Sequence, residues 1–159
     1  MSSTQDPSSE TPQQRLNRNW ADILQELRVI QAGSQIITGF LLAAAFQPRF
    51  AELDPTGRII YFSLLGVAVA TTIVGLTPVL LHRWLFRVGA KESLVDLGGR
   101  LATAALVGVG VTLAGIVLLI VDLVAGLPIG LVAAALTLVV IVGLWVVLPS
   151  TVQRRLGPR

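Results

Sequence analysis

Four long apolar runs constrain the fold of this chain more than any other feature of its sequence. They are Val29–Phe46, Ile59–Leu81, Leu101–Val121 and Leu127–Leu148. The hydrocarbon core of a bilayer is roughly 30 Å thick, and a helix needs about 20 mostly apolar residues to cross it. Charged residues make up only 13% of the chain, against about a quarter of a soluble domain. We therefore predict an all-α fold, a polytopic transmembrane four-helix bundle.

The lengths of the runs set the expected domain organisation. We place the spans at about 29–47, 57–81, 100–121 and 127–148, within one transmembrane domain of residues 15–149. Residues 1–14 are rich in Ser, Thr, Gln and Pro and are predicted to form a disordered tail. Residues 150–159 form a basic C-terminal tail. From Asn17 the pattern is amphipathic, which predicts a helix continuous with the first span.

Local signals fix where two of the spans begin. Asp54 is a good N-cap residue and Pro55 suits the first helical position, so the second span is predicted to begin near Pro55. Pro128 is expected in the first turn of the fourth span for the same reason.

The link between the second and third spans is predicted to be a short cytosolic helical hairpin that turns at Gly89, a natural helix stop. A tight turn at this glycine would place opposite charges at matching heights. The expected ion pairs are Arg83 with Asp96 and Arg87 with Glu92.

The distribution of basic residues predicts the orientation. Of the twelve Lys and Arg residues, ten lie in the N-terminal segment, the 82–100 link and the C-terminal tail. Cytosolic segments of membrane proteins carry such an excess. We therefore expect an inner-membrane protein with both termini in the cytosol. The net charge of +3 is then explained by topology and by contact with the lipid bilayer, and nucleic acid is not an expected partner.

The first span carries the strongest candidate site. Gln31, Gln35 and Thr38 step by four and then three residues, so they form one polar stripe on a helix. Three readings are open: a structural clasp within the bundle or between subunits, a water- or ion-lined half-channel facing the cytosol, or plain interfacial solvation. The polar stripe and His82 are expected at the same cytosolic side of the bundle and are grouped as a candidate polar pocket.

The residues available for catalysis are few. The chain has no cysteine and one histidine, His82, at the end of the second span. A metal site needs several ligands, and covalent catalysis needs a nucleophile beside a base. We expect neither an enzyme nor a bound cofactor or metal. His82 is interpreted as an interfacial anchor, with a proton relay as the alternative, because its pKa lies near neutral.

Three segments also carry a resemblance. They are ELRVIQAGSQIITGFLLAAAFQPRF, LDPTGRIIYFSLL, and TPVLLHRWLFR followed by KESLVDLGGRLA. The region from about Leu27 to Val121 resembles a family of small uncharacterised bacterial four-span membrane proteins. Some members carry a sodium:proton antiporter label, so the resemblance implies possible transport.

Two function classes follow. The first is a non-enzymatic membrane protein that assembles with itself, as a homo-oligomer, or with a membrane partner protein. It is favoured by four-residue spacings of small residues, such as Gly39 and Ala43, which allow helices to approach closely. The second is a small oligomeric ion- or proton-coupled transporter or channel, favoured by the polar stripe and His82.

Overall fold

A computed structural model gives the fold of the chain. It describes residues 11–85 and 91–156, with side chains for 11–81 and 95–155. The helices are α1 (Pro12–Ala44), α2 (Pro55–Leu85), α3 (Lys91–Ala125), α4 (Leu127–Val142) and α5 (Leu148–Leu156). A short 3₁₀ helix, η2 (Pro48–Glu52), lies between α1 and α2, and one π-helical turn, η3 (Gly143–Val147), joins α4 to α5. The predicted all-α fold is confirmed.

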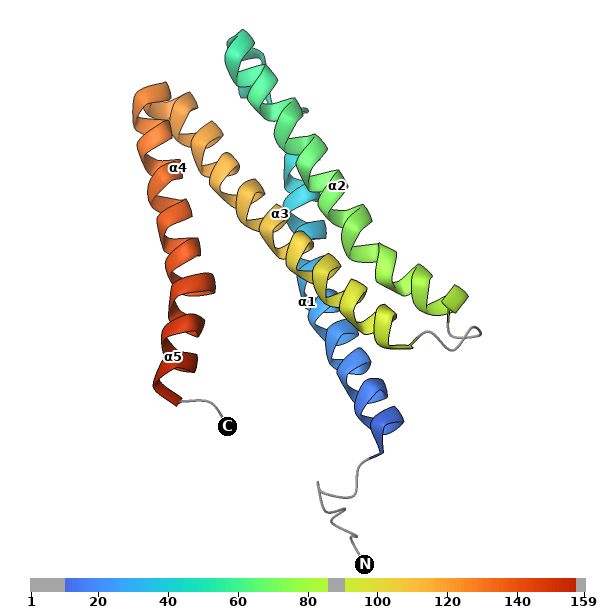
Figure 1. The fold of residues 1–159 in the computed structure, drawn as a ribbon. Helices are drawn as coiled ribbons and strands as arrows, with labels where there is room; N and C mark the ends of the chain where they lie inside the picture. Colours follow the sequence, from blue (N-terminus) through green and yellow to red (C-terminus); the bar gives the residue numbers. More distant parts are fainter. Residues whose placement is uncertain (1–10, 86–90, 157–159) are drawn as a thin grey trace, which may run out of the picture.

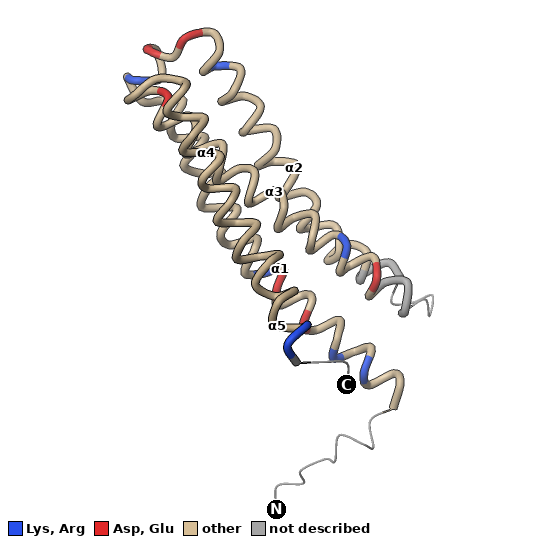
Figure 2. The backbone as a smooth tube through the Cα atoms, turned by 60° about the vertical axis from the view of Figure 1, so that its left-hand side comes forward, with Lys and Arg blue, Asp and Glu red and all other residues tan. Residues whose placement is uncertain are grey.

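Four helical stretches are long and apolar enough to cross a membrane. They are Pro12–Ala44, Pro55–Leu81, Val95–Ala125 and Leu127–Arg155. Large aliphatic side chains are exposed along all four, as lipid-facing residues are. The charged residues gather at the two ends of the helices and leave the middle uncharged (Figure 2). The chain is therefore a multi-pass membrane protein.

The first helix begins earlier than the sequence suggested. Thr11 and Gln14 form a capping box, in which the Thr11 hydroxyl accepts a hydrogen bond from the Gln14 backbone amide. Pro12 occupies the first turn, where its missing N–H is not needed. Residues 12–14, placed by sequence in the N-terminal tail, thus belong to the helix. From there α1 runs without a break to Ala44, which confirms a helix continuous with the first span.

Two other predicted helix starts are confirmed. The Asp54 carboxylate accepts a 2.6 Å hydrogen bond from the Gly57 amide, and α2 begins at Pro55. Pro128 lies in the first turn of α4. The preceding residue, Gly126, has φ of 87°, a conformation that favours glycine and lets α3 reverse directly into α4.

Helices α1, α2 and α3 pack against one another as a three-helix bundle, and α4 packs mainly on α3. Figure 1 shows α4 leaning away from α2, with α3 between them. Because α4 lies beside α3 and away from α2, the four spans do not form one closed ring of helices. One end of the molecule holds the start of α1, the end of α2, the start of α3 and the end of α5 (Figure 1).

The buried residues of α2 follow a strict heptad spacing of four and three. They are Gly57, Tyr61, Leu64, Ala68, Thr71, Gly75 and Pro78. In α1 the buried residues Trp20, Leu27, Ser34 and Leu41 recur every seven. A sustained seven-residue period is the pattern of left-handed coiled-coil packing. Small residues dominate the α2 series, which brings the helix backbones close together.

The closest approaches occur at glycines. A Cβ built on Gly108 of α3 would overlap the Thr71 hydroxyl, and one on Gly115 would overlap the Leu64 side chain. On α4, a Cβ at Gly130 would lie 3.0 Å from the Leu118 carbonyl oxygen. These contacts set the spacing between α2 and α3 and between α3 and α4.

Candidate functional site

The three residues of the predicted polar stripe on α1 differ in how deeply they are buried. Gln31 and Thr38 are half-buried, whereas Gln35 is exposed on the surface of the bundle. The helical positions of Gln31 and Gln35 differ by only about 40°, but the edge of the packed face falls between them. The two amides therefore have different surroundings.

Gln31 lies where the three packed helices meet. A Cβ built on Gly75 of α2 would be 3.5 Å from Gln31 Cγ and 3.9 Å from the Ala105 methyl of α3. The Gln31 side chain therefore lies directly beside Gly75 and close to Ala105. Its Nε2 atom is buried and has no hydrogen-bond partner among the described residues. An unsatisfied buried donor of this kind costs about 1–3 kcal/mol.

The interior of the three-helix bundle also contains buried residues with hydroxyl groups. Ser34, Thr71 and Thr112 are buried, one on each of the three packed helices. The Thr71 and Thr112 hydroxyls donate 2.8 Å hydrogen bonds to the carbonyls of Val67 and Gly108, four residues back on their own helices. Thr38 does the same to Ser34 at 2.8 Å. These donors are satisfied within single helices, so they leave only acceptor lone pairs for a neighbour.

Sequence reasoning did not single out Ser34, Thr71 or Thr112. The heptad spacing carried a usable signal for two of them, because Ser34 falls in the series of Trp20 and Leu27, and Thr71 in that of Tyr61 and Leu64. Hydropathy averaged over a whole span does not reveal these residues, because the apolar residues around each hydroxyl dominate the average.

The other predicted site residues lie largely outside the described side chains. His82 and Arg83 are on the last turns of α2, and Glu92 is on the first turn of α3, but their side chains are not described. Arg87 lies outside the described residues altogether, and Asp96 is exposed. The two hairpin ion pairs and the place of His82 in a polar pocket remain predictions. Within the described part of the chain, no cluster of three metal-ligating side chains occurs.

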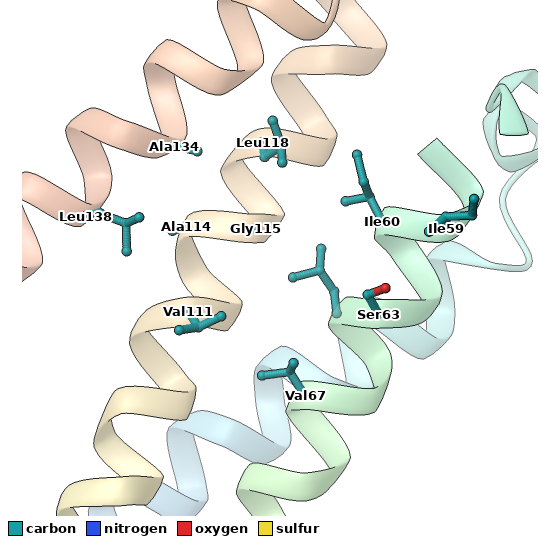
Figure 3. A pocket seen from close by; sticks show the side chains of 11 residues that line it. Ile59, Ile60, Ser63, Val67, Val111, Ala114, Gly115, Leu118, Ala134 and Leu138 are labelled. Atoms are coloured by element: carbon teal, nitrogen blue, oxygen red, sulfur yellow. The ribbon is translucent and has the colours of Figure 1, made fainter. Parts of the chain in front are cut away.

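A separate apolar cleft of about 380 Å³ opens between α2 and α4, with α3 as its floor (Figure 3). Ile60 and Val67 of α2 and Leu138 of α4 point into it. Ser63 supplies the one hydroxyl among its lining residues. Such walls suit an acyl chain or an apolar helix and offer nothing to hold a polar substrate.

A substitution at Gln31 tests whether its buried amide has a hydrogen-bond partner, such as bound water. We expect Gln31→Leu to raise the free energy of unfolding by about 1 kcal/mol, because it removes a buried donor that lacks a partner. Titration with SDS followed by circular dichroism measures this change. Gln25→Leu, at an exposed position of the same helix, is the control, with an effect within about 0.5 kcal/mol. A loss of stability for Gln31→Leu would mean that the amide has a partner, such as bound water.

Comparison with known proteins places the chain in a family. No curated protein and no solved structure matches it. A family model described as a family of unknown function matches residues 9–149. The match includes the first three membrane-spanning stretches in full and the fourth up to residue 149. The chain therefore belongs to this family of unknown function, DUF6328.

Proposed function

We propose that this protein is a non-enzymatic integral membrane protein that acts by assembling in the plane of the bilayer, with itself or with another membrane protein. The position of α4 supports this proposal. This helix packs mainly on α3, and Gly130 is its one buried residue. The apolar cleft beside it has to be filled by lipid or by another helix.

Single-molecule photobleaching in liposomes tests assembly. Fluorescently labelled protein is reconstituted at decreasing protein-to-lipid ratios, and the bleaching steps in each liposome are counted. We expect multi-step traces to exceed the number produced by random co-capture even at high dilution. Single-step traces at every dilution, with no membrane protein partner retained on purification, would contradict the proposal.

We further propose that the chain lies in an inner membrane with both termini in the cytosol, as the distribution of Lys and Arg supports. Because the chain has no cysteine, single cysteines can report sidedness without background. We expect Thr56→Cys to react with an impermeant maleimide on intact cells, and Ser2→Cys and Ser150→Cys to react only after permeabilisation. Labelling of position 2 from outside would reverse the orientation.

Conduction of protons or sodium ions is the second candidate. The buried Gln31 amide without a described partner favours it, because its N–H donor can bind a water molecule in the bundle interior, and bound water can relay protons or hydrate a sodium ion. This candidate requires a flux across liposomes that Gln31→Leu abolishes.

A further inference from the structure

Gln35 is a polar residue at an unfavourable depth. It is exposed on α1 and makes no hydrogen bond to any residue that the structure describes. It lies nine residues before Ala44, where α1 ends, and seven after Arg28. At 1.5 Å per residue these separations are about 13 Å and 10 Å. Gln35 therefore lies deep within the hydrocarbon layer.

An amide at this depth needs a hydrogen-bond partner, because lipid tails provide neither donors nor acceptors. The three-helix bundle does not provide one among the described residues, since Gln35 lies just outside the packed face, about 100° around α1 from the buried Ser34. A second membrane protein molecule can supply the partner at the same depth.

We propose that Gln35 pairs with Gln35 of the partner subunit, in a parallel dimer of this chain formed through the exposed face of α1. Membrane insertion gives both copies the same orientation, so their two-fold axis lies along the membrane normal. A residue close to such an axis meets itself at the same depth. An amide carries both a donor and an acceptor, so a symmetric pair satisfies both copies. This inference rests on the proposed function, assembly in the bilayer, and names the partner and the surface.

The surface beside Gln35 suits close approach of two helices. Gly39 and Ala43 follow it at about 40° and 80° around α1, and both are exposed. A Cβ built on Gly39 would meet nothing within 4 Å. Small residues four apart let two membrane helices cross closely, at about 40°. Such a crossing separates the helices toward the cytosol, which keeps the Arg28 residues of the two copies apart.

The dimer equilibrium tests the role of the amide. Energy transfer between labelled copies is measured in liposomes over a series of lipid dilutions. We expect Gln35→Leu to raise the dissociation constant about tenfold, which corresponds to 1.4 kcal/mol. Gln35→Asn should retain most of the affinity because it keeps an amide. Ile73→Leu, at an exposed position on α2, should leave the constant unchanged.

Cross-linking tests the surface independently. In the cysteine-free chain, Ala43→Cys should form a dimer disulfide on oxidation, and Gly33→Cys, exposed on another side of α1, should not. Gln35→Leu in the Ala43→Cys background should reduce the cross-link. If the protein self-associates but Gln35→Leu has no effect and Ala43→Cys does not cross-link, the α1 interface is wrong and assembly stands. If the wild type is monomeric and binds no other membrane protein, both proposals fail.

Discussion

Replacing Tyr61 with alanine is expected to lower the free energy of unfolding by about 3 kcal/mol or more, the loss seen when a buried aromatic residue is truncated. Tyr61 is only 1% exposed and lies in a cluster with Leu41, Leu64 and Ala68. Its hydroxyl donates a 2.8 Å hydrogen bond to the Leu41 carbonyl, which joins α2 to α1. Its ring meets Phe50 edge-on, with centroids 4.8 Å apart. This one side chain therefore holds the end of α1, η2 and the start of α2 together.

Two further variants serve as references for the loss of unfolding free energy expected of Tyr61→Ala. Tyr61→Phe removes only the hydroxyl and should cost about 1 kcal/mol. Phe40→Ala truncates an aromatic side chain that is 73% exposed, and its effect should stay within about 0.5 kcal/mol. Unfolding in SDS, followed by circular dichroism, gives all three values. Equal losses for Tyr61→Ala and Phe40→Ala would contradict the described core.

Adding one methyl group at Gly108 should cost about 1–3 kcal/mol, the usual penalty for overpacking a core. The new Cβ would overlap the Thr71 hydroxyl and lie 3.0 Å from Thr71 Cβ. Gly66→Ala is the matched control on α2, because a Cβ there meets nothing within 4 Å. It should raise stability by up to about 1 kcal/mol, since alanine restricts the unfolded chain.

A double substitution shows whether Thr71 is the cause of the Gly108 effect. In Thr71→Ala, the space left by the hydroxyl and methyl should accept the new methyl at position 108. The two substitutions together should then cost less than the sum of the single ones, by at least about 0.5 kcal/mol. Additive losses in the same SDS titration would show that another contact opposes alanine at Gly108.

Much of the fold was predictable because its signals are local. Asp54 and Pro55 specify the start of α2 through one hydrogen bond and one fixed dihedral angle. The lengths of the apolar runs specify four helices, and the described part of the chain contains four that could cross a membrane. The Thr11 capping box is an equally local signal, but the polar composition of residues 1–14 predicted a tail there. The helix begins at Pro12, three residues earlier than the predicted end of the tail allowed.

The arrangement of the helices was not predictable in the same way. The fourth run is apolar on every side, so its sequence does not indicate which face packs. In the structure it packs mainly on α3, with a close backbone approach at Gly130. The difference in burial between Gln31 and Gln35 likewise depends on contacts with other helices. Both lie on one stripe of α1, and only the positions of Gly75 and Ala105 on other helices decide that Gln31 is the inner one.

The central claim is that the inside of this bundle is structural and that the protein works through its membrane-embedded surface. Proton and sodium flux into liposomes tests it most directly, with wild type beside Gln31→Leu, Gln35→Leu and His82→Ala. Under a pH gradient or a membrane potential, we expect wild type and all three variants to match empty liposomes. A flux in wild type that Gln31→Leu abolishes would contradict the claim and establish conduction through the bundle.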